Sequence, residues 1–318
     1  MRIALLFIDG VGMGERDAAK NPLARGDFLL SQFADGAGVA LPLGGERFIL
    51  DTTFGVPGRP QSASNQTALL TGEAAPQLMG RHVLGFPNAP LRALLDARSI
   101  AKRMVASGLR ADFANGYPAG YLDALGLARR PSAAAEVTIP DNARRRLRPS
   151  ATTAAMAAAN VALRTFDDIR SDTALTHDIV GHRGRAHGFS LPNRTPAEAV
   201  EIFWQLGAQT DFLLFEHFLA DEAGHAQDAP LAFAALSTFD EFARGVVANR
   251  PADAGVMIVS DHGNVEDLST RSHTLNTVAA LWFGPARAPL GATPKNLAEL
   301  GNTLLTTLGV NEATQQSS

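Results

Sequence analysis

The chain has 318 residues and a mass of 33.5 kDa, a length that corresponds to one large domain or two ordinary ones. Hydrophobic residues make up 46% and charged residues 19%, which excludes a disordered chain, and the lack of cysteine excludes disulfides, thiolate metal sites and a cysteine nucleophile. A net charge of −4 gives no positive field that would attract nucleic acid, and no apolar run reaches the length of about 20 residues that a membrane span needs. We therefore expect a cytoplasmic protein that binds neither nucleic acid nor a membrane.

Strand and helix patterns alternate in the first part of the chain. Ile3–Ile8 is a continuous apolar run, which is typical of a strand covered on both faces of a sheet. Ser99–Ala106 has a helical pattern that Gly108 ends, and Leu109–Ala114 follows as a candidate strand.

The same alternation returns after residue 193. Thr195 and Glu198 form a capping-box signature with Pro196 at the first helical position, and Gly207 closes that helix. Further predicted elements are the strands Asp211–Phe215, Gly255–Ser260 and Thr277–Phe283, a helix with the apolar stripe Leu236, Phe239, Phe242 and Val246, and a last helix over Leu297–Leu308, followed by a frayed tail. This order predicts an α/β fold with a mostly parallel sheet sandwiched by helices.

The middle of the chain loses this rhythm between Tyr117 and Pro192. It contains alanine runs, several glycines and an arginine cluster. We interpret residues 117–192 as a small inserted cap or lid on a core made of residues 1–116 and 193–318. Long irregular loops are the alternative, although loops of this length are uncommon in compact domains.

Aspartates and histidines follow or precede the predicted strands at the points where ligands bind to an open α/β sheet. The segments are Ile8-Asp9-Gly10, Asp221-Glu222-Ala223-Gly224-His225, Ser260-Asp261-His262-Gly263-Asn264 and His273-Thr274-Leu275-Asn276-Thr277-Val278. Each residue alone has an ordinary interpretation as a helix cap or a packed side chain. Together, carboxylates and imidazoles at one sheet edge indicate a site for Zn²⁺ or Mn²⁺.

These motifs resemble those of the alkaline phosphatase superfamily of two-metal phosphoryl-transfer enzymes. Within it, the chain is most similar to the branch of cofactor-independent phosphoglycerate mutase and phosphopentomutase. The resemblance covers roughly Met1–Gly85 and Thr195–Gly284, and an insertion between these parts is also typical of the branch. It implies an alkaline phosphatase-like core and two divalent metal ions, Mn²⁺ or Zn²⁺.

The resemblance also implies a ligand set for each metal. One ion is expected at Asp221, His225 and His273. The other is expected at Asp9, Asp261, His262 and the oxygen of the nucleophile. The branch's substrate-binding motifs are not recognisable in the middle segment, so the identity of the substrate does not carry over.

The nucleophile has two candidates in the segment from Gly58 to Gly72. The superfamily begins a short helix at a serine or threonine and ends it at a glycine, and the spacing from Ser62 to Gly72 matches that pattern. Counting forward from Gly58-Arg59-Pro60, as in the mutases, points to Thr67 instead. We prefer Ser62, because a hydroxyl at a helix N-terminus has free backbone N–H groups beside it that favour bound phosphate.

Phosphoryl transfer from a small phosphate monoester through a phosphoserine is the predicted reaction, with water (a phosphatase) or a second hydroxyl (a phosphomutase) as the acceptor. Arginines of the middle segment are candidates to clamp an anionic substrate, although a solvated basic face is the simpler interpretation of each: Arg144, Arg145, Arg146, Arg148, Arg183 and Arg185. A phosphodiesterase, a sulfatase-like hydrolase and a non-catalytic metal- or phosphate-binding relative remain alternatives. The sequence does not indicate an oligomeric state.

Overall fold

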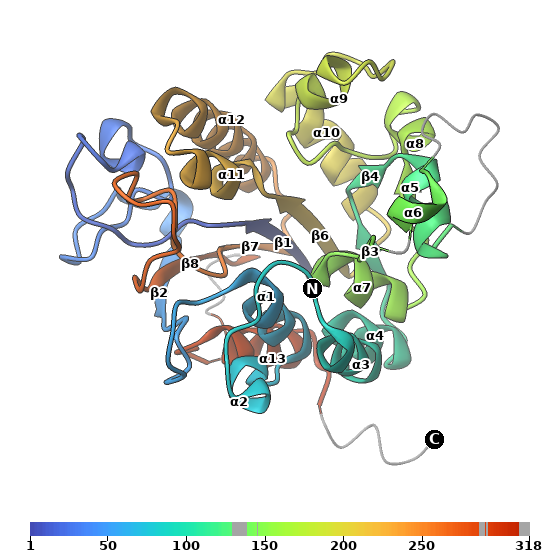
Figure 1. Cartoon of the computed structure of the whole chain (residues 1–318), viewed down its shortest axis with the longest axis horizontal. Coiled ribbons are helices and arrows are strands. Elements are labelled where there is room, and N and C mark those ends of the chain that lie inside the picture. The colour runs from blue at the N-terminus through green and yellow to red at the C-terminus, as the bar shows by residue number, and fades with distance from the viewer. Residues whose placement is uncertain (129–138, 145, 286–289, 291, 312–318) are drawn as a thin grey trace.

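The computed structural model describes residues 1–128, 139–144, 146–285, 290 and 292–311. Its centre is a six-stranded sheet that crosses the molecule (Figure 1). The strand order is β2 (Glu46–Leu50), β8 (Val278–Phe283), β7 (Ala254–Val259), β1 (Arg2–Ile8), β6 (Phe212–His217) and β3 (Ala111–Phe113). The alternation of the sequence therefore gives the α/β fold that it predicts.

Strands β7, β1, β6 and β3 are parallel, and β8 runs antiparallel to both of its neighbours. The predicted strands at both ends of the chain are confirmed with small shifts in their bounds. The edge strand β2 is not predicted by the sequence pattern. It joins the sheet through antiparallel pairing with β8.

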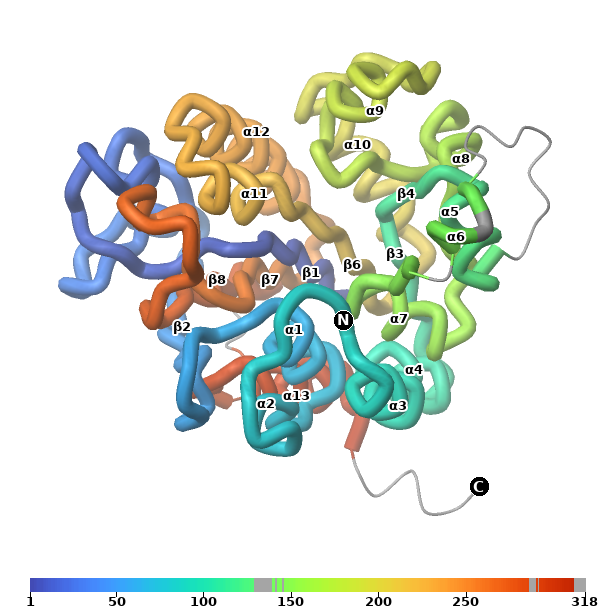
Figure 2. The backbone as a smooth tube through the Cα atoms, viewed as in Figure 1, coloured from blue at the N-terminus to red at the C-terminus, as the bar shows by residue number. Residues whose placement is uncertain are grey.

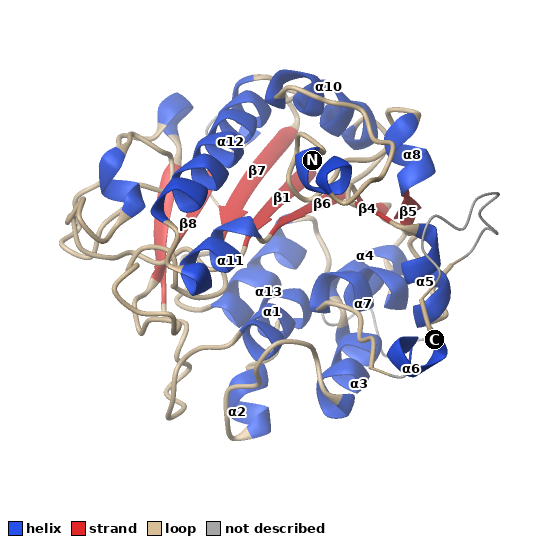
Figure 3. Cartoon of the chain, turned by 45° about the horizontal axis from the view of Figure 1, so that its top comes forward, coloured by secondary structure: helices blue, strands red, loops and turns tan. Residues whose placement is uncertain are grey.

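Helices cover both faces of the sheet (Figure 3). Along β1, Ile3, Leu5 and Phe7 face one apolar cluster, and Ala4, Leu6 and Ile8 face the other, because successive side chains of a strand point to opposite faces. The first face is covered by α1 (Ser62–Thr71), α3 (Ala89–Arg98), α4 (Ile100–Ala106), α7 (Ala151–Ala158) and α13 (Leu297–Thr307). The second is covered by α10 (Pro196–Gly207), α11 (Leu219–Ala226) and α12 (Ala229–Ala248). Of these helices, α10 has the predicted capping box at Thr195 and Glu198.

Residues 117–192, which we call the inserted segment, contain short elements, although residues 129–138 and Arg145 lie outside the described part (Figure 2). The elements are β4 (Gly116–Tyr117) at its start, α5 (Ala119–Leu125), α6 (Asp141–Arg144), α7, β5 (Arg164–Thr165), α8 (Phe166–Arg170) and α9 (His182–Ala186). Helix α7 packs into the main core through Ala151, Ala155 and Met156. A separate small cluster consists of Phe166, Ile169, Ala174 and Leu191. The division into core and cap stays a prediction, and α7 belongs to the core by its packing.

Helix α1 is held close to α13 by a glycine. A Cβ atom at Gly301 would lie 2.2 Å from the carbonyl oxygen of Leu69, so only glycine permits this approach. At its C-terminus α1 ends at Gly72, whose φ of 75° is left-handed. At the other end of the helix, its first residue, Ser62, contacts His262 at 2.9 Å. Among the described residues, none of the helices is both long and apolar enough to cross a membrane.

Candidate metal centre

Three parallel strands bring the predicted aspartates to one edge of the sheet. Strands β6, β1 and β7 are neighbours in register and end at His217, Ile8 and Val259. Asp9 and Asp261 follow β1 and β7 closely, and Asp221 lies in the first turn of α11 after β6. His273 precedes β8, and it reaches the same edge because β8 runs in the opposite direction.

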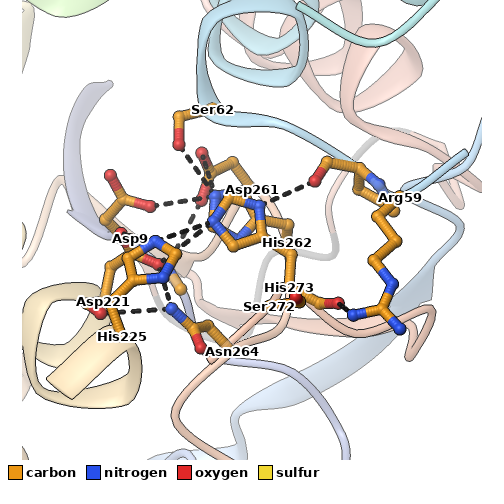
Figure 4. Close-up of polar contacts among 12 residues, drawn as sticks. Asp9, Arg59, Ser62, Asp221, His225, Asp261, His262, Asn264, Ser272 and His273 are labelled. Atoms are coloured by element: carbon orange, nitrogen blue, oxygen red, sulfur yellow. Dashed lines mark hydrogen bonds and ion pairs between the residues drawn. The ribbon is translucent and has the colours of Figure 1, made fainter. Parts of the chain in front are cut away.

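The first group of side chains surrounds the imidazole of His262 (Figure 4). Its Nε2 atom lies 2.9 Å from Ser62 Oγ, 3.3 Å from Asp9 Oδ1 and 3.5 Å from Asp261 Oδ2. Both His262 and Asp261 are fully buried, and Asp9 is 8% exposed. The structure thus brings together all four residues of the second predicted ligand set.

The second group lies beside the first and contains Asp221, His225 and His273 (Figure 4). His225 Nε2 lies 3.3 Å from Asp221 Oδ2 and 3.1 Å from His273 Nε2, and His273 Nε2 lies 3.6 Å from Asp221 Oδ1. The ligand atoms of Asp221 and His273 also lie within 4.8 Å of a nitrogen of His262. The two groups are therefore contiguous.

Hydrogen bonds on the far side of two imidazoles set their tautomers. His273 Nδ1 is 2.8 Å from the carbonyl oxygen of Pro60, and His225 Nδ1 is 2.7 Å from that of Arg271. A carbonyl oxygen only accepts, so each Nδ1 carries the proton and donates it. In the neutral imidazole each Nε2 then presents a lone pair to the group, which is the usual arrangement of a metal-binding histidine.

The arrangement fits cations better than protons. A single N–H at His262 Nε2 can point at one acceptor, yet three oxygens lie within 3.5 Å of this nitrogen. The buried Asp9 Oδ1 atom has no hydrogen-bond partner among the described residues. In the second group, His225 Nε2 and His273 Nε2 lie 3.1 Å apart, and each lies within 3.6 Å of an oxygen of Asp221. Carboxylate oxygens and imidazole nitrogens in this arrangement are suitable ligands for Zn²⁺ or Mn²⁺.

The electrostatics of the groups agree with this fit. Burial raises the pKa of Asp9 well above its usual value, and the carboxylate of Asp261 raises it further. Burial also raises the pKa of Asp261. A hydrogen bond with Asp221 raises the pKa of His225 to about 9, so a cation that binds there would displace the proton on its Nε2 atom, whereas burial lowers the pKa of His273 to about 4 and leaves it neutral. Crowded carboxylates that resist ionisation gain a favourable counter-charge when a divalent cation binds.

The two candidate nucleophiles have different surroundings. Ser62 is the first residue of α1, and its hydroxyl contacts the first group. Thr67 lies in the middle of the same helix, fully buried, and its hydroxyl donates a hydrogen bond of 2.6 Å to the carbonyl oxygen of Ala63. A backbone partner of this kind is typical of a structural threonine.

Sequence reasoning missed the amide side chains that hold the carboxylates. Gln66, one turn after Ser62, donates from Nε2 to Asp9 Oδ2 at 3.1 Å and to Asp261 Oδ2 at 3.0 Å. Asn65 donates to the backbone oxygen of Asp261 at 2.9 Å. A neutral amide side chain is not a typical metal ligand, so no motif points to it. The available signal is the position of Gln66, one helical turn after Ser62.

A second buried support, Glu266, joins three loops of the site. One oxygen of its carboxylate accepts from the backbone N–H of Gly12 at 2.9 Å and of Asn264 at 2.7 Å. The other accepts from the side chains of Thr274 and Asn276. Glu266 therefore ties the loop after β1 to the two segments that carry His262 and His273.

Most of the described candidate arginines show no contact with these groups. Arg144, Arg146 and Arg148 are exposed, and Arg145 lies outside the described residues. Arg185 donates to the carbonyl oxygens of Val180 and Pro192, which gives it a local structural partner. Arg183 pairs with Glu222, one residue after the ligand Asp221. Of the described arginines in the set, Arg183 is thus the one placed beside the centre.

Comparison with known proteins agrees with these motifs. A model of the Metalloenzyme superfamily matches residues 193–312. The 2,3-bisphosphoglycerate-independent phosphoglycerate mutase of Natronomonas pharaonis is 33% identical over 156 residues, which are 46% of this chain and 30% of that protein. The corresponding mutase of Desulforudis audaxviator is 30% identical over 126 residues, which are 37% of this chain and 25% of that protein. The match therefore spans less than a third of each relative.

Solved structures share the fold over nearly the whole chain. Alkaline phosphatase from the Antarctic bacterium TAB5 has a TM-score of 0.55 at 13% identity and covers 98% of this chain and 99% of its own. Thermus thermophilus alkaline phosphatase has a TM-score of 0.52 at 12% identity and covers 98% of this chain and 92% of its own. The family model thus matches the last part of the chain, and the solved structures show that nearly the whole chain has the alkaline phosphatase fold.

Proposed function

We propose that the chain is a two-metal phosphoryl-transfer enzyme that acts on small phosphate monoesters through a phosphoserine at Ser62. The observation that carries the proposal is the convergence of Ser62 Oγ, Asp9 and Asp261 on His262 Nε2, within 2.9–3.5 Å. The first metal would be held by Asp221, His225 and His273, and the second by Asp9, Asp261, His262 and Ser62. Both Mn²⁺ and Zn²⁺ suit these ligands.

Ser62 is placed to act as the nucleophile. Its Oγ would form a bond to phosphorus, while the bond from phosphorus to the alcohol oxygen breaks and the alcohol leaves with a proton. The first N–H groups of α1 lack partners within the helix and would donate to the phosphoryl oxygens. When bound, the divalent ions would neutralise the charge of the phosphoryl group and activate the attacking hydroxyl.

Supporting side chains would keep this geometry fixed. Gln66 restrains both carboxylates of the first group, and Glu266 restrains the loops that carry His262 and His273. Such partners orient ligands, so that little rearrangement is needed during the reaction.

The acceptor of the phosphoryl group separates a phosphatase from a phosphomutase. Water would release inorganic phosphate and restore Ser62, and a second hydroxyl of the substrate would give an isomer. We favour a phosphatase, because no arginine or lysine among the described residues lines the cavity beside Ser62, and such a side chain would help to retain an anionic intermediate. A phosphodiesterase is the second candidate on the same core. A cytoplasmic location stays a prediction from the sequence.

Turnover and trapping test the proposal together. Protein loaded with Mn²⁺ or Zn²⁺ is expected to release phosphate from phenyl phosphate, and brief acid quenching is expected to leave a phosphoryl group that peptide mass mapping finds on Ser62. Ser62→Ala should lower kcat by about a thousandfold or more. Thr67→Val is the matched control from the same helix, and it should retain trapping. A phosphoryl group on Thr67, or turnover of a diester but of no monoester, would overturn the proposal.

A further inference from the structure

A cavity of about 600 Å³ opens directly beside Ser62. One side of it is the proposed reaction centre, with Asp9, Ser62 and Asp221. The lining also includes four aromatic side chains from separate parts of the chain: Phe86, Tyr117, Tyr121 and Phe218. A substrate with its phosphoryl group at Ser62 would therefore have the rest of its atoms in a cavity that these rings line.

Packing keeps the aromatic wall in place. The rings of Tyr117 and Tyr121 have centroids 5.8 Å apart, and the ring of Phe218 stacks on His177 at 3.9 Å. Burial lowers the pKa of His177 to about 3, so this imidazole is neutral and adds to the wall as a flat ring. Rigid aromatic surfaces bind flat apolar groups with little loss of side-chain entropy.

Phe86 is the most accessible part of the wall. Its side chain is 57% exposed although it lines the cavity, so it presents apolar surface that a ligand can cover. Leu84, two residues earlier, is 73% exposed and does not line the cavity. Substitutions at Phe86 and Leu84 can therefore distinguish an effect on the cavity from a general effect on this loop.

The cavity offers no basic side chain among the described residues. Besides the proposed metal ligands Asp9 and Asp221, the lining includes Glu216 and Glu222, and no described arginine or lysine belongs to it. Glu222 is paired with Arg183, and Glu216 is 4% exposed, with bonds to its Oε2 atom from Thr152 at 2.7 Å and Tyr117 at 3.4 Å. A carboxylate or a second phosphate on the substrate would find no unpaired cationic side chain among the described lining residues.

We propose that this cavity binds the leaving-group part of the substrate and selects phosphate monoesters of neutral aromatic alcohols over phosphorylated acids. The inference rests on the proposed function for the position of the phosphoryl group. It departs from an arginine clamp in the inserted segment, because the cavity walls would give affinity through apolar contact and the described lining has no basic side chain for a second negative charge.

Phosphonates test this selectivity without turnover, because the phosphorus–carbon bond is not cleaved and leaving-group reactivity plays no part. Calorimetric titration of metal-loaded protein would compare naphthylmethylphosphonate, methylphosphonate and 3-phosphonopropionate. Burial of the naphthyl ring is expected to lower Kd at least about tenfold relative to methylphosphonate. The carboxylate of 3-phosphonopropionate is expected to give no gain over methylphosphonate.

Variants then locate the effect. Phe86→Ala should raise Kd for naphthylmethylphosphonate about fivefold to tenfold more than it raises Kd for methylphosphonate, and Leu84→Ala should change neither. Equal affinity for the two ligands, tighter binding of 3-phosphonopropionate, or an equal response of the two variants would overturn the inference. Phosphate release from phenyl phosphate by the same protein tests the proposed function separately. Release without naphthyl selectivity would reject the cavity assignment alone, and selective binding without release would reject the proposed reaction alone.

Discussion

The metal end of the sheet and the inserted segment differ in how their side chains are held. At the sheet edge, Asp261 and His262 are fully buried, and each carboxylate of the first group has an amide partner. In the inserted segment, Arg144 and Arg146 are exposed, and a separate cluster of four buried apolar residues stabilises its second half. The strand register thus positions the chemistry, while the segment supplies walls to the cavity through Tyr117 and Tyr121.

The largest expected effect is loss of metal from the sheet edge. Asp261→Asn combined with His262→Ala removes two of the proposed ligands of one ion and a neighbour of the other, so at least one of the two proposed ions per chain should be lost. Elemental analysis after dialysis measures this directly. The paired control, Asp123→Asn with His187→Ala, changes an exposed aspartate and an exposed histidine of the inserted segment. Metal content that is equal in both variants would contradict the assignment of the ligands.

Loss of the amide beneath the carboxylates should have the next largest effect. Gln66→Ala removes the donor shared by Asp9 and Asp261 and should weaken metal binding about 10- to 100-fold. Competition with a chelator measures the affinity. Gln205→Ala, at an exposed position on α10, is the control. Unchanged affinity in Gln66→Ala would mean that the carboxylates are positioned by the backbone alone.

Stability of the inserted segment should be separable from the metal centre. Ile169→Ala leaves a cavity in the small apolar cluster and should lower the free energy of unfolding by about 2 kcal/mol. Urea denaturation measures the loss, and metal content per chain should not change. If this variant also lost metal, the two regions would be one cooperative unit and the comparison would fail.

The smallest effect is expected from the arginine cluster. Arg144→Gln, Arg145→Gln and Arg146→Gln together should change KM for phenyl phosphate less than about twofold, because both described members are exposed and neither lines the cavity. Steady-state kinetics at constant ionic strength provide the measurement. A tenfold rise in KM would instead support the anionic clamp that the sequence alone leaves open.

Much of the metal centre is predictable because the sequence encodes it locally. Ile3–Ile8 and Gly255–Ser260 are continuous apolar runs that end directly at Asp9 and Asp261, so the pattern gives both the strand and the side chain at its end. The order of the Asp and His motifs also carries the superfamily resemblance. The predicted helix from Ser62 is present with the expected glycine at its end.

Other features depend on contacts between distant parts of the chain. Strand β2 has only five residues, and it becomes part of the sheet by pairing with β8, which lies more than two hundred residues later in the chain. Gln66 and Glu266 act through buried hydrogen bonds to residues far away in the sequence, and an amide or an acid in a loop has no signature of that kind. In the inserted segment, the alanine-rich helix α7 is a core element by contact rather than by pattern.

Anomalous diffraction from crystals of the Mn²⁺-loaded protein tests the central claim most directly. The account predicts two peaks per chain, one contacting Asp221, His225 and His273 and the other contacting Asp9, Asp261, His262 and Ser62. Strong peaks elsewhere with these side chains left in their hydrogen bonds, or a single peak that excludes Ser62, would contradict a two-metal centre built around the serine.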